Sequence, residues 1–115
     1  MTNQKKHPKE LGLKKENEIL TMPSAILNPS QYSYLTALPG RGYMVMATNI
    51  DPDYSATIDI YVDQQGWLTS GNPVEPGRAV TFTIQQMNGN WVYVQNTSAQ
   101  PVQGRPSVNF ALYAM

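Results

Sequence analysis

The feature that most constrains the fold is a succession of short strand-like segments, separated by turn residues at roughly ten-residue spacing. Residues 55–63 (SATIDIYVD) place Ile58, Ile60 and Val62 on one face and polar residues on the other, because side chains alternate along a strand. Comparable segments are residues 31–38, 43–50, 67–70, 78–87, 91–96 and 107–115. No stretch after residue 21 has the period of an amphipathic helix. The pattern predicts an all-β protein, built as an antiparallel β-sandwich or barrel.

Residues 81–97 (TFTIQQMNGNWVYVQNT) are the clearest hairpin candidate. Asn88-Gly89 is a preferred pair for a type I′ turn, which needs positive φ at both central residues. The return strand carries bulky groups on both faces, so we expect Trp91 and Tyr93 to pack against either a second sheet or a neighbouring subunit. Further upstream, residues 71–73 (GNP) are expected to end the short strand at residues 67–70.

The first 21 residues differ in composition from the rest of the chain. Five of the eight basic residues fall here, at Lys5, Lys6, Lys9, Lys14 and Lys15. We therefore predict a flexible N-terminal arm at residues 1–21, followed by one β-sandwich domain at residues 22–115. The alternative is an arm that becomes ordered on a partner, with Ile19 and Leu20 as its apolar contact.

Charge and composition restrict the partners. Residues 1–20 carry five positive and three negative charges, or +2, and residues 21–115 carry three positive and five negative, or −2. A body at −2 argues against nucleic-acid binding, which depends on clustered Lys and Arg. No run of about 18 apolar residues predicts a membrane span. No apolar segment follows the charged start as a signal peptide would require.

The chain lacks the usual catalytic residue sets. There is no cysteine, and the single histidine, His7, lies in the arm, so a histidine base on the sheet is excluded. The body's acids fall in turns or on a polar strand face, where we expect them to be solvated: Asp51, Asp53, Asp59, Asp63 and Glu75. We predict a protein that is not an enzyme and uses no cofactor or metal. The alternatives are an Asp59 and Asp63 catalytic site, and a calcium site at Asp51-Pro52-Asp53, which otherwise forms an Asx turn.

Aromatic residues supply the candidate binding site. Tyr61, Trp67, Trp91 and Tyr93, together with Tyr43 and Tyr54, could form a ligand platform or a protein interface, because rigid rings offer contact area at low entropic cost. The competing explanation is that strands simply favour Tyr and Trp. An exposed platform would favour a non-catalytic carbohydrate-binding module.

Two segments resemble a known family. Residues 74–83 (VEPGRAVTFT) form a proline-glycine turn leading into a Thr-rich strand, and Gly104 precedes residues 108–113 (VNFALY). They resemble the endospore appendage subunits of Bacillus-type bacteria. The resemblance implies a jelly-roll fold, an N-terminal arm that reaches into neighbouring subunits, and a place on the cell or spore surface. That family's arm carries cross-linking cysteines, and their absence here means that packing and hydrogen bonds must hold the arm.

Surface composition favours the same function. Lysine is absent after residue 15, so the predicted strands lack the Lys residues with which monomeric proteins block their sheet edges. We predict a structural, self-assembling fibre or layer subunit, a homo-oligomer or filament joined by β-strand packing and the docking arm. Carbohydrate is the alternative partner.

Overall fold

The computed structural model describes residues 5–18 and 24–115. In these ranges the elements are two short 3-10 helices, η1 (Pro8–Glu10) and η2 (Lys15–Asn17), followed by eight strands. The strands are β1 (Ser24–Leu27), β2 (Tyr32–Thr36), β3 (Tyr43–Asn49), β4 (Ala56–Val62), β5 (Gly66–Val74), β6 (Ala79–Ile84), β7 (Trp91–Asn96) and β8 (Val108–Ala114).

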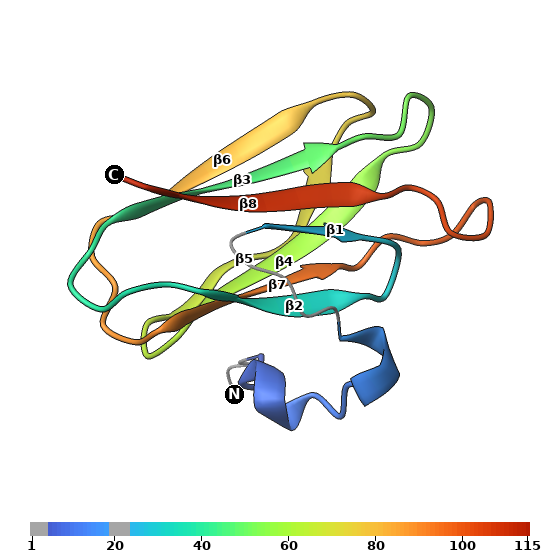
Figure 1. Ribbon diagram of the computed structural model, residues 1–115. Coiled ribbons are helices and arrows are strands. Elements are labelled where there is room, and N and C mark those ends of the chain that lie inside the picture. Colours follow the sequence, from blue (N-terminus) through green and yellow to red (C-terminus); the bar gives the residue numbers. More distant parts are fainter. Residues whose placement is uncertain (1–4, 19–23) are drawn as a thin grey trace.

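The strands form two antiparallel four-stranded sheets, ordered β1-β8-β3-β6 and β2-β7-β4-β5, which pack face to face (Figure 1). Successive strands mostly alternate between the sheets, and this order is that of a jelly roll. The predicted all-β sandwich is therefore confirmed.

The core lies between the two sheets. Most strands turn alternate residues inward, β5 being the clearest exception. The largest fully buried apolar side chains include Leu27, Leu35, Ile58, Ile60 and Phe110. Ile58, Ile60 and Val62 share the inner face of β4 as predicted. The alternation of a half-buried strand explains why the sequence located most strands within two residues.

The predicted hairpin at residues 81–97 is wrong. β6 pairs with β3 in one sheet, whereas β7 pairs with β2 and β4 in the other. Neither Asn88 nor Gly89 has positive φ, so no type I′ turn forms. Instead the segment crosses between the sheets, with Met87 buried at the end of the core and the Asn90 amide donating to Asp63 Oδ2 at 3.0 Å. Tertiary pairing has overridden a strong local turn signal.

Two further strand predictions need correction. β5 does not end before residues 71–73 but runs through them, because two bulges in its pairing with β4 absorb the irregular residues. Gly71 there has φ +68°, a conformation that glycine adopts without steric cost. β1 was not predicted at all, since four residues between prolines give too short a pattern.

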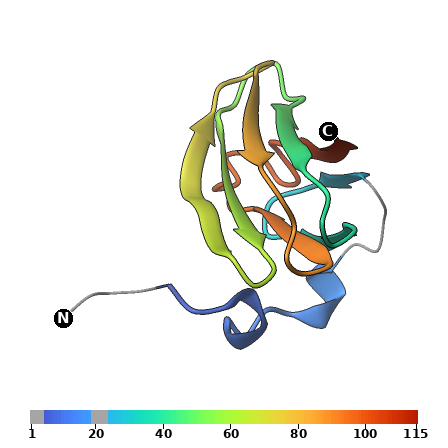
Figure 2. The same ribbon diagram turned by 90° about the vertical axis from the view of Figure 1, so that its left-hand side faces the viewer.

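Residues 5–18 lie outside the two sheets and along the outer face of β2-β7-β4-β5 (Figure 2). This position against the same chain was not predicted. Ile19 and Leu20, the predicted apolar contact of the arm, fall outside the described residues. Flexibility of the arm as a whole remains a prediction.

Candidate functional site

The outer face of the β2-β7-β4-β5 sheet carries a continuous group of aromatic rings. The register aligns Tyr34, Tyr93, Tyr61 and Trp67 in one row across all four strands. Tyr32 and Trp91 flank this row on β2 and β7. We call these six residues the aromatic face.

The rings of the aromatic face contact one another from strand to strand. Tyr93 lies in the middle, fully buried, with ring centroids 5.4 Å from Tyr34 and 5.9 Å from Trp67. Its hydroxyl donates to Gln95 Oε1 at 2.6 Å, and burial raises the Tyr93 pKa far above its usual range. Tyr61 stacks on Trp91 with centroids 6.0 Å apart. Tyr93 therefore acts as a structural centre. Tyr32 is also buried, at 4% exposed, so the contact surface comes from the half-buried rings of Tyr34, Tyr61, Trp67 and Trp91.

Residues 5–18 lie across this face and contact it with alternate residues. Lys5 binds the Asp59 carboxylate and the Ser70 hydroxyl, with its ammonium 4.3 Å from the Trp67 ring centroid. The Trp67 indole N–H donates to the Lys6 carbonyl at 3.2 Å. Charge, cation–π attraction and hydrogen bonding thus act together at this end of the arm.

The arm then passes over the middle of the sheet. The His7 ring lies edge-on to Tyr61 and Trp91, with centroids 5.0 and 5.5 Å away. The Lys9 ammonium lies 5.3 Å from the Trp91 centroid and 5.7 Å from that of Tyr34. At the far edge, Glu18 forms a parallel bridge with Tyr32 of β2. The arm therefore reaches from β5 to β2.

Asp59 is buried beneath the arm, contrary to the prediction that the body's acids are solvated. Only 3% of Asp59 is exposed, and its Oδ1 accepts a hydrogen bond from the Gly71 amide at 2.7 Å. Lys5 supplies the compensating charge. A buried carboxylate needs such partners, so the burial of Asp59 depends on the contact with Lys5 of the arm.

The predicted site residues Tyr61, Trp67, Trp91 and Tyr93 come together on one face. Tyr43 and Tyr54 do not join them: Tyr43 lies in the core and Tyr54 packs beside Arg105. The sequence reasoning missed Tyr32 and Tyr34, although their spacing of two residues in a predicted strand placed both on one face. It also missed Lys5, His7 and Lys9, whose alternation in the arm was the available signal.

The expected partner of Trp91 and Tyr93 was either a second sheet or a neighbouring subunit. The inner residues of β7, Val92 and Val94, meet the second sheet. Trp91 instead meets the arm of its own chain, and Tyr93 is enclosed by its neighbouring rings.

A cavity of about 470 Å³ lies between the arm and the β2 side of the aromatic face. Its walls include Lys9, Lys15 and Glu18 from the arm and Tyr32, Tyr34 and Trp91 from the sheet. The volume falls in the range of sites for small molecules, roughly 300–1,000 Å³.

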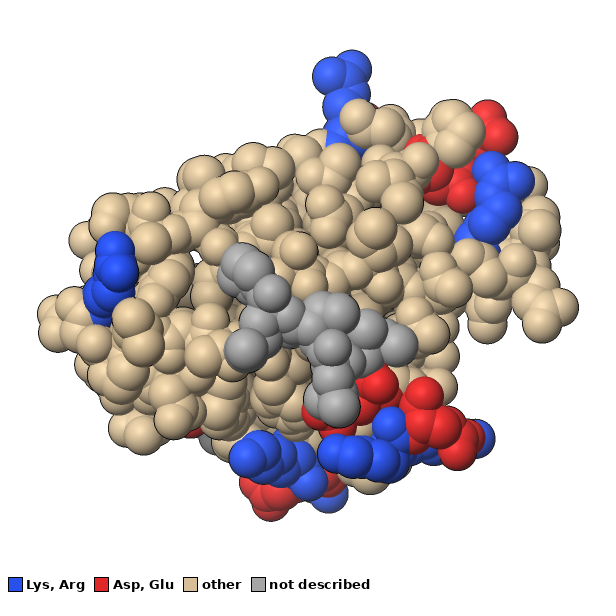
Figure 3. Space-filling model, in the orientation of Figure 1, with Lys and Arg blue, Asp and Glu red and all other residues tan. Residues whose placement is uncertain are grey.

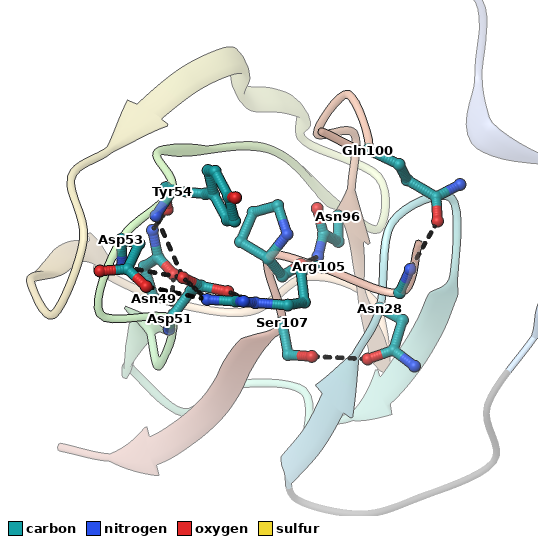
Figure 4. A network of polar contacts seen from close by, with 11 residues as sticks. Asn28, Asn49, Asp51, Asp53, Tyr54, Asn96, Gln100, Arg105 and Ser107 are labelled. Atoms are coloured by element: carbon teal, nitrogen blue, oxygen red, sulfur yellow. Dashed lines mark hydrogen bonds and ion pairs between the residues drawn. The ribbon is translucent and has the colours of Figure 1, made fainter. Parts of the chain in front are cut away.

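A second polar group lies at one end of the sandwich (Figure 4). Asp51 accepts from the amides of Asp53 and Tyr54, which confirms the predicted Asx turn. Arg105 donates from Nε and a terminal nitrogen to the two Asp51 oxygens at 2.7 and 2.9 Å, and also to Asp53 at 3.3 Å. Asp51 is buried rather than solvated, and these hydrogen bonds, chiefly those from Arg105, hold its pKa well below 3.8.

This group connects the loop at Asp51 to the loop at Arg105. Arg105 occupies the carboxylate oxygens that a calcium ion would need. Across residues 5–18 and 24–115, no three His, Cys, Asp or Glu side chains come together as a metal site requires. None of the helices in those ranges is long and apolar enough to cross a bilayer.

Comparison with protein-family models, with characterised proteins and with solved structures finds no match to the chain. The site must therefore be interpreted from its own geometry.

Proposed function

We propose that the protein is a structural subunit that self-assembles into a fibre or layer at a cell or spore surface. The observation that carries this proposal is the uncharged outer face of the β1-β8-β3-β6 sheet, which ends in an unprotected edge strand. The N-terminal arm supplies a second contact.

The outward-facing side chains of the β1-β8-β3-β6 sheet include no charged residue. They are Ser24, Ile26, Met44, Met46, Thr48, Ala79, Thr81, Thr83, Asn109, Ala111 and Tyr113. Ile26 and Tyr113 are 60% and 49% exposed, which is high for large apolar residues. Figure 3 shows charged side chains gathered along the arm and at one end, with single basic side chains at the opposite end and at the upper edge, while the surface over β8 and β3 is largely free of them. A second copy would meet no like-charge repulsion on this face.

The edge strand β6 is the least protected of the four sheet edges. β1 has only four residues, β5 is bulged and contains Pro73, and β2 has Glu18 of the arm bridged to Tyr32. β6 pairs with β3 over six residues without a register shift, and it contains no Pro, Gly or charged residue. Its backbone is thus available for strand pairing with another copy.

The inward-facing residues of β6 also favour an added strand. Val80 and Phe82 pack on the core but are only partly buried, because no strand covers them on the far side. A neighbouring strand would bury more of both side chains and gain about 25 cal/mol for each Å² of apolar surface covered.

The arm provides the second contact, because the aromatic face can bind the arm of its own chain or the arm of a neighbouring copy. The contacts of Lys5 and His7 with the aromatic face could form equally well between two subunits. Such an exchange reuses the intrachain contacts between two chains, so it links subunits without requiring an additional binding surface. β6 and the arm lie on different sheets, so both contacts can operate at once (Figure 1).

Electron microscopy and light scattering of the purified full chain test this function. Thr81→Lys combined with Thr83→Lys places charges on the exposed side of β6, and we expect it to abolish or strongly reduce assembly. Ala99→Lys combined with Gln103→Lys adds the same two charges on an exposed loop and is the matched control. Both proteins should keep the stability of the native monomer to within about 0.5 kcal/mol. A strict monomer at high concentration, with and without residues 1–18, would refute the proposal.

The arm reduces the aromatic surface that is open to a sugar, which restricts the carbohydrate-binding alternative. Tyr61, Trp67 and Trp91 are half-buried, and Lys5 and His7 contact parts of their rings. An open sugar platform is therefore not available while the arm is seated. The remaining aromatic surface lies in the cavity beside Tyr32 and Tyr34.

A further inference from the structure

The cavity between the arm and β2 has two perpendicular aromatic walls. The rings of Tyr34 and Trp91 lie 5.0 Å apart at 88°, and those of Tyr32 and Tyr34 lie 6.0 Å apart at 90°. Walls of this kind form a corner that a small ring-shaped molecule can enter and contact on two sides.

Two unused phenol groups belong to these walls. Within the described part of the chain, the hydroxyls of Tyr32 and Tyr34 have no hydrogen-bond partner, whereas that of the neighbouring Tyr93 is bonded to Gln95. Burial, with smaller effects from Tyr32 and Glu18, raises the pKa of Tyr34 to about 12. A tyrosine hydroxyl is protonated at neutral pH, so that of Tyr34 can donate a hydrogen bond to a ligand.

The cavity also contains an uncompensated positive charge. Lys15 pairs with Glu18 at 2.8 Å, but Lys9 forms no ion pair with any described residue. The residues outside the described ranges include no acid that could pair with it. Two lysines and one glutamate leave the lining at +1, with the Lys9 ammonium beside Trp91 and Tyr34.

We propose that this cavity binds an acidic sugar, a hexuronate unit of a polysaccharide. The sugar ring would enter the corner between Tyr34 and Trp91, its hydroxyls would bond to Tyr32 and Tyr34, and its carboxylate would pair with Lys9. A neutral hexose would make no use of the exposed Lys9 ammonium, and a small inorganic anion would leave the aromatic walls uncovered. A hexuronate uses both features.

Ligand binding and assembly are separable. The cavity is complete within one chain, so a monomer that never assembles still carries the site. Failure to bind a sugar would leave the β6 edge and the arm contacts unaffected, and failure to assemble would leave the cavity intact.

Titration calorimetry with trigalacturonate, its methyl ester and inorganic phosphate tests the site on the full chain. We expect the free acid to bind at least tenfold more tightly than the ester, because a charge-assisted hydrogen bond to Lys9 is lost in the ester. Inorganic phosphate should bind more weakly than trigalacturonate. Equal affinity for the acid and the ester, phosphate binding as tight as that of the sugar, or no binding to any of them would overturn the proposal.

Single variants distinguish specific binding of the sugar in the cavity from non-specific attraction of an acidic sugar to the basic arm. Lys9→Gln should weaken trigalacturonate binding at least tenfold, and Tyr34→Phe, which removes only the hydroxyl, should weaken it several-fold. Lys14→Gln removes an equal charge from the arm outside the cavity and should leave affinity unchanged. Indole N–H resonances of Trp67 and Trp91 should confirm that the arm stays seated in each variant. Equal losses in Lys9→Gln and Lys14→Gln would identify non-specific attraction and refute the site.

Discussion

The Lys5–Asp59 ion pair should control whether the arm stays seated on the sheet. Asp59 is 3% exposed, and the side chain of Lys5 is about one-third exposed, so the pair is shielded on one side only. A hydrogen bond to a charged group contributes about 1.5–3 kcal/mol, and the partial exposure of Lys5 places this pair toward the lower end. We expect a coupling energy of about 1–2 kcal/mol, or roughly a five- to thirtyfold change in the docking equilibrium.

A double-mutant cycle isolates that coupling. Asp59→Asn keeps the shape and the acceptor for the Gly71 amide, and so loses only the ionic part. Lys5→Met leaves a buried carboxylate without its cation. That cost cannot exceed the free energy of arm docking, because undocking returns Asp59 to water. The double variant should resemble Asp59→Asn alone, which means that the two single effects are not additive.

Tryptophan fluorescence reports this equilibrium directly. The only two tryptophans of the chain, Trp67 and Trp91, both contact the arm. Emission should shift to longer wavelength in both single variants, because the rings become hydrated when the arm undocks. In the native protein, added salt should cause a shift in the same direction, because it screens the ion pair. Lys14→Met is the control for loss of charge. If the effects of Asp59→Asn and Lys5→Met are additive, or if emission is unchanged in both of them and in the double variant, the ion pair does not hold the arm.

Three further predictions concern the sandwich itself. Asp51 has a lower pKa in the native state than the value of 3.8 that applies in the unfolded chain, so its ionised form stabilises the native state above pH 3.8. This stabilisation is lost as the pH falls below 3.8. Asp51→Asn should therefore be less stable at pH 7 and should lack this acid dependence in denaturant titrations from pH 7 to pH 2. Gly89→Ala would place a Cβ atom 2.1 Å from Asp63 Oδ2 and should cost about 1–3 kcal/mol in urea unfolding, whereas a fully stable variant would contradict the close approach. Met87→Ala should cost about 2–5 kcal/mol by the same measurement because Met87 fills the end of the core, and a loss below 1 kcal/mol would argue against that packing.

The sequence predicted elements whose signal is local and periodic. Ile58, Ile60 and Val62 have the alternation of a half-buried strand, and the structure gives them one buried face. The Asx turn at Asp51 was also predictable, since its hydrogen bonds join residues within three positions. Both cases need no knowledge of distant partners.

The failures involve partners far apart in the chain. Asn88-Gly89 has strong hairpin propensity, but β6 pairs with β3 and β7 with β4, so long-range pairing decided the connection. Likewise, the burial of Asp59 depends on Lys5, 54 residues away, and could not be read from the polar face of its own strand. The aromatic face was predicted in part because Tyr61, Trp67, Trp91 and Tyr93 are conspicuous, while its cover was missed because a lysine-rich segment has the composition of a disordered tail.

The arm and the β6 edge make different predictions for assembly, and Asp59 distinguishes them. If subunits exchange arms, Lys5 of one chain pairs with Asp59 of the next, so Asp59→Asn weakens both the intrachain seat and the contact between copies. If β6 alone joins the subunits, Asp59→Asn leaves assembly unchanged while Thr81→Lys with Thr83→Lys abolishes it. If both contacts operate, each change shortens the filament, and combining the two leaves monomers. Particle length by electron microscopy across these three proteins therefore assigns the contact to a sheet edge, to the arm, or to both.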